Sequence, residues 1–368
     1  MPALMLRAAP RHLRAACAFL FALSCAPCAL HAQGMESETS AAGTAEETYP
    51  SLKIRGFTDV DYAATDSAAT PDGFQLGQFV LHLTSPLARK VSFFGELSMT
   101  PSGHDFHAEV ERSFIRYDYN DLFKISVGRY HTPIGYWNTA YHHGLWLQTT
   151  VRRPEQVKLG GIYIPVHFVG LVAEGKLPSG GLGLGYSAGV GNGRGEDPSR
   201  GGDNGDVNTN RAWIVQLLSR PFDAYGLEAG AALYRDLVPL TAPSSAREWI
   251  YSAHVAWTRE SPELIGEFIG VEHEVVGLSG KYDSRSFYVQ AAYRLPGAAN
   301  QVKPYTRYER MEIASGDPIY AQPDLQVVTG GIRVDLIDVA AVKAEYRNQL
   351  TEGAGRTNTL WLQACLTF

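Results

Sequence analysis

The sequence predicts an all-β fold, a transmembrane antiparallel β-barrel of about 16 strands with an inward-folded constriction loop. Three observations lead to this prediction. Segments in which apolar and polar residues alternate recur from residue 51 to the end of the chain, as a lipid-facing barrel wall requires. The same region has no run of eighteen apolar residues, which excludes a transmembrane helix there. Every second connection between segments is short. A soluble β-sandwich is the alternative fold, although it gives no reason for connection lengths to alternate.

The N-terminus has the pattern of a secretory signal peptide. Three arginines within residues 7–14 precede an apolar run over residues 15–30, which is short for a membrane span. Leu30 and Ala32 suit the positions before a signal peptidase site, so cleavage is expected after Ala32. A lipoprotein signal is the alternative, and it would require cleavage before Cys25 or Cys28. The predicted organisation is a signal peptide at 1–32, a flexible periplasmic lead-in at 33–50 and a transmembrane β-barrel at 51–368, with 131–165 as the constriction loop.

Charge and cysteine content narrow the class of protein. Removing residues 1–32 takes away three arginines and changes the formal charge from −6 to −9. A chain this acidic is not expected to bind nucleic acid. Three of the four cysteines lie in the part removed, so Cys365 cannot form an intramolecular disulfide. A closed barrel needs no such staple, because its hydrogen-bond ladder is continuous.

The last nine residues give the clearest strand pattern. One face carries Leu360, Leu362, Ala364, Leu366 and Phe368, and the other carries Trp361, Gln363, Cys365 and Thr367. Apolar residues facing lipid and polar residues facing water are typical of an outer-membrane barrel strand. A terminal Phe368 on such a strand resembles the signal read by the bacterial barrel assembly machinery, which is therefore an expected partner.

Sixteen segments share this alternation, and bacterial single-chain barrels have an even number of strands. They are expected at 51–62, 73–85, 90–100, 108–119, 122–130, 166–177, 182–192, 210–219, 225–236, 247–259, 262–275, 283–295, 302–314, 324–336, 339–351 and 356–368. The short connections lie at 85–89, 120–121, 178–181, 220–224, 260–261, 296–301 and 337–338, and the intervening ones are expected to be longer. Aromatic residues near strand ends are candidates for the interfacial girdles: Tyr62, Tyr119, Trp249, Trp257, Tyr346 and Trp361.

The longest connection, 131–165, is the candidate constriction loop. A barrel of this size leaves an aqueous lumen unless something narrows it. The loop contains Trp137, Tyr141 and Trp146, which are too apolar to extend into water, so it is expected to fold back into the barrel. A loop that caps the mouth or packs on a neighbouring protomer is the alternative. Inward folding would place these residues at the constriction: His142, His143, Gln148, Arg152, Arg153 and Lys158.

The segment at the exit of the fifth predicted strand reads Gly-Arg-Tyr-His-Thr-Pro-Ile-Gly over residues 128–135. It resembles the turn found in porins related to the phosphate-selective porins. Gly128 and Gly135 would permit the bend, Pro133 would stiffen it, and Arg129 would brace it. The resemblance implies that the following loop is the constriction loop and that the protein is a homotrimer. Members of that family bind anions with dense lysine arrays, whereas this chain has eight scattered lysines, so phosphate selectivity does not follow from the resemblance.

Projecting the alternation inward predicts a lumenal wall of mixed charge. Its predicted residues are Arg112, Arg116, Arg294, Arg307, Arg333, Lys343, Arg347, Glu309, Asp335 and Glu345. Such a wall would give a transverse field that orients hydrated solutes, with a modest basic excess. The alternative is that these charges pair across neighbouring strands and stiffen the wall.

The sequence therefore predicts a porin that passes small polar or anionic solutes by passive diffusion, and not an enzyme. Outer-membrane lipid and lipopolysaccharide of a Gram-negative bacterium are expected partners. No catalytic residues, cofactor or metal site are expected: Ser252 and His254, on one strand face, make no triad by themselves, and adjacent histidines such as His142 and His143 lack zinc-enzyme spacing. The alternatives are an outer-membrane barrel enzyme and a non-conducting adhesion or anchor barrel. An ordered loop inside the barrel would argue against the anchor.

Overall fold

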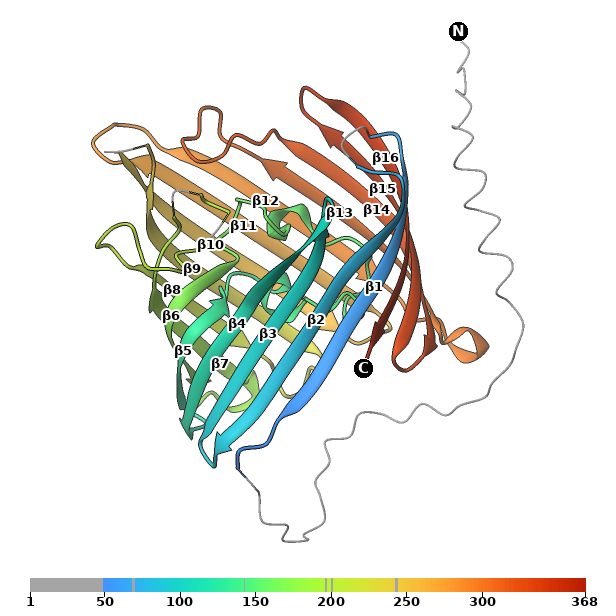
Figure 1. The fold of residues 1–368 in the computed structure, drawn as a ribbon, viewed down its shortest axis with the longest axis horizontal. Helices are drawn as coiled ribbons and strands as arrows, with labels where there is room; N and C mark the ends of the chain where they lie inside the picture. Colours follow the sequence, from blue (N-terminus) through green and yellow to red (C-terminus); the bar gives the residue numbers. More distant parts are fainter. Residues whose placement is uncertain (1–48, 68–69, 142, 196, 200, 242–243) are drawn as a thin grey trace. The chain divides into compact units, whose positions relative to one another are not determined.

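The strands pair edge to edge and close into a barrel (Figure 1). The computed structural model describes residues 49–67, 70–141, 143–195, 197–199, 201–241 and 244–368. Within these residues sixteen antiparallel strands form one closed sheet, in which each strand pairs with its neighbours in sequence and β1 pairs with β16. The predicted 16-stranded antiparallel barrel is therefore confirmed. The predicted signal peptide and nearly all of the lead-in lie outside the described residues.

The strand boundaries lie within a few residues of those predicted. The first eight are β1 (Lys53–Thr65), β2 (Gly73–Ala88), β3 (Val91–Ser102), β4 (Asp105–Asn120), β5 (Phe123–His131), β6 (His167–Lys176), β7 (Leu184–Gly191) and β8 (Ala212–Ser219). The others are β9 (Leu227–Pro239), β10 (Ser245–Thr258), β11 (Glu263–Val275), β12 (Tyr282–Ala292), β13 (Val302–Glu312), β14 (Leu325–Ile337), β15 (Ala340–Thr351) and β16 (Gly355–Thr367). Short helical turns are α2 (Trp137–Ala140), η1 (Glu155–Val157), η2 (Gly180–Leu182) and η3 (Gly297–Ala299).

Two predictions about the connections are wrong. Residues 85–88 continue β2 instead of forming a turn. Pro86 pairs with Ser92 of β3, but its carbonyl faces β1, where it accepts from Ser51 N–H. Because β1 and β2 last pair at Thr84, the missing N–H on that same side interrupts no ladder bond. The end of the barrel opposite the short turns also has brief connections, since β3 and β4 are joined by Gly103 and His104 alone. Length is concentrated in three connections, at 132–166, 192–211 and 313–324.

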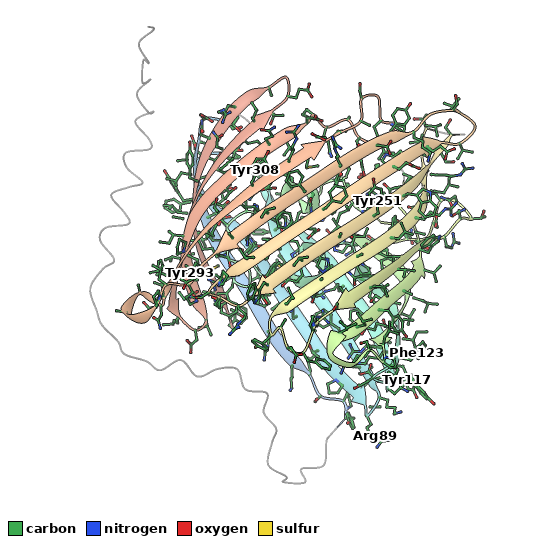
Figure 2. The ribbon with its side chains drawn as sticks, turned by 180° about the vertical axis from the view of Figure 1, so that it is seen from behind. Arg89, Tyr117, Phe123, Tyr251, Tyr293 and Tyr308 are labelled. Carbon is green, nitrogen blue, oxygen red and sulfur yellow. The ribbon has the colours of Figure 1, made fainter. Side chains whose placement is uncertain are left out.

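The outer face of the wall is apolar. Large side chains such as Val60, Ile115 and Leu233 lie exposed there at 40–48% of their surface, as expected of a surface that contacts lipid. Figure 2 shows Tyr117, Phe123 and Tyr293 pointing outward toward the short-turn rim, and Tyr251 and Tyr308 nearer the other rim. The predicted girdle residue Trp361 is an exception, because it faces inward and is 5% exposed.

The two ends of the sheet meet at the C-terminal residue. The backbone N–H of Phe368 donates to Gly56 O at 3.0 Å, and Gly56 N–H donates to Phe368 O at 2.8 Å. These bonds extend the β1–β16 ladder, whose last full pair is Phe57 with Thr367. The Phe368 ring lies on the outer face beside Phe79, with 6.0 Å between ring centroids. In the described part of the chain, no helix is long and apolar enough to cross a membrane.

Candidate functional site

The β5–β6 connection leaves the wall where β4 and β5 separate. Pairing of the two strands ends at Ser113 with Arg129. Residues 105–112 of β4 still pair with β3, but their edge that faces β5 has no strand partner. Arg129 covers this edge: its guanidinium donates to the carbonyl oxygens of Val110 and Glu111 and pairs with Asp203 of the β7–β8 loop at 2.7 Å. Arg129 thus joins the strand edge to a second loop, consistent with the predicted brace.

Two glycines make the entry possible. Gly128 has φ +148°, and a Cβ there would lie 2.0 Å from Ser113 O. Gly135 has φ +71°, and a Cβ there would lie 1.9 Å from a carboxylate oxygen of Glu267. Both positions require glycine because of conformation and space together. Pro133 is buried between them. From this turn the connection crosses the interior of the barrel (Figure 1).

Wall carboxylates hold the loop by its backbone N–H groups. Glu267 of β11 accepts from the N–H groups of Tyr136 and Trp137 at 3.0 and 3.1 Å. Glu345 of β15 accepts from Val151 N–H at 2.8 Å. An irregular segment has few intrasegment partners for its backbone, and a buried N–H without an acceptor is costly. These carboxylates therefore replace the partners that secondary structure would supply. A third contact of this kind joins Glu309 to the N–H of Glu155 at 2.7 Å.

Wall cations hold the loop by its carbonyl groups in the same way. Arg333 of β14 donates to Trp146 O at 2.6 Å and to Gln148 O at 3.0 Å. Lys343 of β15 donates to Leu145 O at 2.5 Å and to Thr150 O at 3.1 Å. Arg307 of β13 donates to Arg152 O at 2.9 Å. Arg347 instead pairs with a loop side chain, the Glu155 carboxylate, at 2.5 Å.

These contacts change the interpretation of the predicted lumenal wall. Arg307, Arg333, Lys343, Arg347, Glu309 and Glu345 lie on the inner face, as the alternation predicts, but each is at most 8% exposed. Their charged groups bind the loop, so they do not present an open transverse field to solutes. The remaining four predicted wall residues form ion pairs with other side chains: Arg112 with Glu96, Arg116 with Asp118, and Arg294 with Asp335.

The predicted constriction residues are dispersed along the loop. Gln148 is fully buried and bonds the loop backbone at Thr150 O and Val151 O. Arg152 lies over the Trp361 ring, 4.7 Å from its centroid. Arg153 is buried and donates to Val157 O at 3.0 Å. Lys158 is exposed, with its Nζ 3.8 Å from the Glu155 carboxylate, and His142 lies outside the described residues. Gln148 and Arg153 thus support the loop from within and do not project from it.

Two loop residues have shifted pKa values with opposing causes. Burial, together with the neighbouring Arg152, lowers the pKa of Arg153 to about 9, and Glu111 acts in the opposite direction. Burial raises the pKa of Glu155, but the cations around it, Arg347 first, outweigh burial and hold that pKa below its ordinary value of 4.5. Glu155 is therefore ionised at neutral pH, which maintains its ion pair with Arg347.

The apolar side chains of the loop form a core inside the barrel. Trp137 is completely buried and packs edge-on against Tyr141 and Tyr288, with ring centroids 5.1 and 5.9 Å away. Tyr163 is 2% exposed and packs against Tyr320. The expectation that these aromatics require shelter is thereby met, and the loop neither caps the mouth nor lies outside the barrel.

Sequence reasoning missed the residues from other loops that hold this one. Arg194 of the β7–β8 loop donates to Ile162 O at 2.6 Å, and the hydroxyl of Tyr320 in the β13–β14 loop donates to Tyr163 O at 2.6 Å. Glu267 was also missed, although its alternation with the apolar Phe268 indicates a side chain on the inner face of the wall. Nothing in the sequences around Arg194 and Tyr320 indicates that those loops turn inward.

A cavity of about 820 Å³ remains beside the loop at the short-turn end of the barrel. It lies along β5 to β9, opposite the wall that binds residues 145–152. Its charged lining is balanced between Lys124, Lys176 and Arg220 and the acidic Asp121, Glu174 and Glu228. Several of these charges pair locally, including Arg220 with Glu228 at 2.6 Å and Lys176 with Asp121 at 3.4 Å.

One cluster in the described residues has donor groups that suit a metal ion. It contains His131, His143 and His167 with the carboxylates of Glu96 and Glu111.

The enzyme alternative gains no support from Ser252 and His254. His254 Nε2 contacts Glu228 at 3.2 Å, and Ser252 Oγ accepts from Gly135 N–H.

The fold is shared with solved outer-membrane proteins. An anion-selective porin from Comamonas acidovorans matches with a TM-score of 0.65 at 12% identity, covering 87% of this chain and all of that one. The outer membrane channel DcaP of Acinetobacter baumannii gives 0.59 at 12% identity, covering 89% and 100%. The outer membrane protein OmpT of Vibrio cholerae, in its trimer form, gives 0.59 at 14%, covering 87% and 100%.

No protein-family model matches the sequence, and no curated protein does. At 12–14% identity the structural matches show a common fold. Together with the apolar outer face, they identify the chain as a β-barrel of the bacterial outer-membrane type.

Proposed function

We propose that this protein is an outer-membrane porin through which small polar solutes diffuse passively. The observation that carries the proposal is the position of loop 131–165 inside a closed 16-stranded barrel, bound to the wall at Glu267, Glu345 and Arg333. A barrel of this size would otherwise enclose a wide aqueous channel. A loop held so firmly narrows it to a defined passage. An adhesion or anchor barrel would have no use for such an internal segment.

The passage is proposed to run beside the loop along β5 to β9. The cavity of about 820 Å³ lies there, and its lining is polar at Lys124, Glu174 and Gln216. Equal numbers of acidic and basic residues in the lining favour neutral polar solutes and give no strong preference between small anions and cations. Phosphate selectivity of the type found in the porins that the 128–135 turn resembles is not proposed, because the lining lacks an array of lysines.

Several further properties complete the proposal. Residues 1–32 are a signal peptide and residues 33–50 a periplasmic lead-in. Phe368 is the assembly signal, and the barrel lies in outer-membrane lipid beside lipopolysaccharide. A homotrimer is proposed from the turn resemblance, and one neighbour of the same fold has a trimer form. The protein is proposed not to be an enzyme.

Single-channel recording in planar bilayers tests the function. The refolded protein is expected to give stepwise openings. Its reversal potential under a salt gradient is expected to lie close to zero. A variant lacking residues 138–162 is expected to conduct more, because the passage widens when the loop is removed. A folded barrel that never conducts, with or without these residues, would contradict the porin proposal and favour the enzyme or anchor. Closed-barrel folding is checked by the heat-dependent shift in gel mobility.

A further inference from the structure

Three histidines and a glutamate meet where the inner loop leaves and rejoins the wall. His131 is the last residue of β5 and His167 the first of β6, and the two are directly paired across the strands. His143 comes from the middle of the loop, and Glu111 from β4. Sequence spacing alone gives no sign of this cluster, since its members come from four separate segments.

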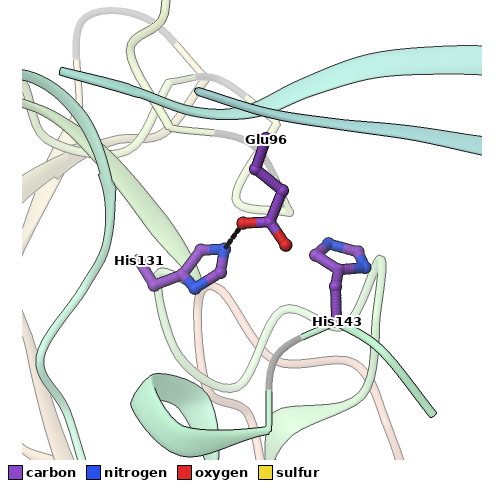
Figure 3. A group of neighbouring side chains, drawn as sticks. All are labelled: Glu96, His131 and His143. Carbon is purple, nitrogen blue, oxygen red and sulfur yellow. Dashed lines mark ion pairs between the residues drawn. The ribbon is translucent and has the colours of Figure 1, made fainter. Parts of the chain in front are cut away.

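The donor atoms of this cluster lie close together. His143 Nε2 is 3.1 Å and His167 Nε2 is 3.0 Å from the two carboxylate oxygens of Glu111. Donor atoms of Glu111, His131 and His167 all lie within 4.8 Å of one another. His131 and His143 meet the same limit in a second group with Glu96. Figure 3 shows His131 and His143 on either side of Glu96, with His131 Nε2 3.5 Å from its carboxylate.

We propose that His131, His143, His167 and Glu111 form a binding site for a divalent transition-metal ion of the Zn²⁺ class. Imidazole nitrogens and carboxylate oxygens are both common Zn²⁺ ligands, in sets such as three histidines or two histidines with a glutamate. Tetrahedral ligands with bonds of about 2.0–2.1 Å have donor atoms about 3.4 Å apart. His143 and His167 lie 3.1 and 3.0 Å from Glu111, close to that separation, and His131 lies within 4.8 Å of Glu111 and His167. Side-chain exposure of the four is 12% or less, so the ion would be shielded from water.

Glu96 is better suited to a supporting position than to a ligand position. Its carboxylate is already paired with Arg112 at 2.5 Å and with His82 at 2.9 Å. Glu111 accepts from the neutral Ser98 hydroxyl at 2.5 Å and is contacted by two of the three histidines, His143 and His167. A hydroxyl that donates to a ligating carboxylate is the kind of neighbour that orients metal ligands.

A bound ion would fasten the loop at three points. The ligands lie at its beginning, at its middle and just after its end, and Glu111 joins all three to β4. The metal would thereby stiffen the loop on the side opposite the Glu345 and Arg333 contacts. The site does not depend on whether the barrel conducts. The alternative is that the histidines only form ion pairs with the two glutamates.

Calorimetric titration of the folded protein with ZnCl₂ in detergent micelles tests the site. One Zn²⁺ per chain is expected, and His143→Gln and His167→Gln should each weaken binding by about tenfold or more. His107→Ala is the matched control, because His107 forms an exposed pair with Glu109 at 3.4 Å outside the cluster. Equal loss in H107A and H143Q, or no binding by the unaltered protein, would overturn the proposal.

A second measurement uses only the unaltered protein, so its result does not depend on whether the histidine variants fold. Co²⁺ added to the unaltered protein should give the intense visible absorption of a four-coordinate nitrogen and oxygen site. Weak absorption like that of the hydrated ion would overturn the proposal even if the histidine variants do not fold.

Discussion

The carboxylate of Glu345 on β15 accepts a 2.8 Å hydrogen bond from the backbone N–H of Val151, which lies 194 residues earlier in the chain. This contact is one of a series in which a charged wall residue bonds the loop main chain. The charged residues of the inner wall therefore hold the loop in position. Polar side chains inside a barrel usually face water. Here several of them instead supply hydrogen-bond partners for the backbone N–H and C=O groups of an irregular loop.

Removing the Glu345 carboxylate should loosen the loop and lower stability. Glu345→Ala leaves the N–H groups of Val151 and Arg152 and the Tyr305 hydroxyl without this acceptor. The free energy of unfolding should fall by about 1–3 kcal/mol, and open-channel current noise should increase. Urea unfolding followed by tryptophan fluorescence measures the first effect. Glu352→Ala, at an exposed turn, is the control, and equal losses in both variants would contradict the anchoring role.

Gly135→Ala should be more damaging than Gly160→Ala. Both residues have positive φ, +71° and +65°, so each substitution costs about 1–2 kcal/mol from conformation. At Gly160 no atom lies within 4 Å of the added Cβ, whereas at Gly135 the Cβ meets the Glu267 carboxylate. Moving that carboxylate breaks its bonds to two loop N–H groups and should add about 1–2 kcal/mol. Equal unfolding free energies in the two variants would show that Glu267 has room to move.

The ion pair between Glu155 and Arg347 should persist on mild acidification. The pKa of Glu155 is held below 4.5, so the stability from its ionised form is present above pH 4.5 and is lost as pH falls through the lowered pKa. The rise in channel noise that follows loss of this ion pair should therefore begin below about pH 4.5. Arg347→Ala removes the nearest cation and should move the rise to higher pH. Arg356→Ala, at an exposed site, should leave the pH of this rise unchanged. If both variants move the rise equally, the cause is the change in net charge and not the Glu155–Arg347 ion pair.

The barrel could be predicted because period-two alternation is a local property. The inward positions of Arg307 and Lys343 follow from their neighbours in sequence, and so does the outward position of Leu366. The connection at 103–104 could not be predicted, because a polar Ser-Gly-His-Asp sequence is equally compatible with a long loop and with a two-residue hairpin turn.

The partners of the wall residues could not be predicted from the sequence. Whether Lys343 faces water or a carbonyl group depends on the path of a loop almost 200 residues earlier, and its bond to Leu145 O spans 198 residues. The loop's burial followed from Trp137 and its aromatic neighbours, but its route across the barrel did not. The His131, His143, His167 and Glu111 cluster was missed for the same reason, because strand pairing at long range assembles it.

Lys124→Glu should shift ion selectivity toward cations. Lys124 lines the cavity beside the loop and is paired in register with Glu174, so the substitution places two carboxylates where charge was balanced. Two charge units at about 8 Å in water correspond to about 1 kcal/mol, a change of about fivefold in the anion-to-cation permeability ratio. Reversal potential under a salt gradient measures this ratio. Lys281→Glu makes the same charge change in the β11–β12 loop, where Lys281 pairs with Glu272 at 2.8 Å, and should have a much smaller effect. Because surface charges are screened beyond about 10 Å at 0.1 M salt, equal shifts in the two variants would mean that solutes do not pass along β5 to β9.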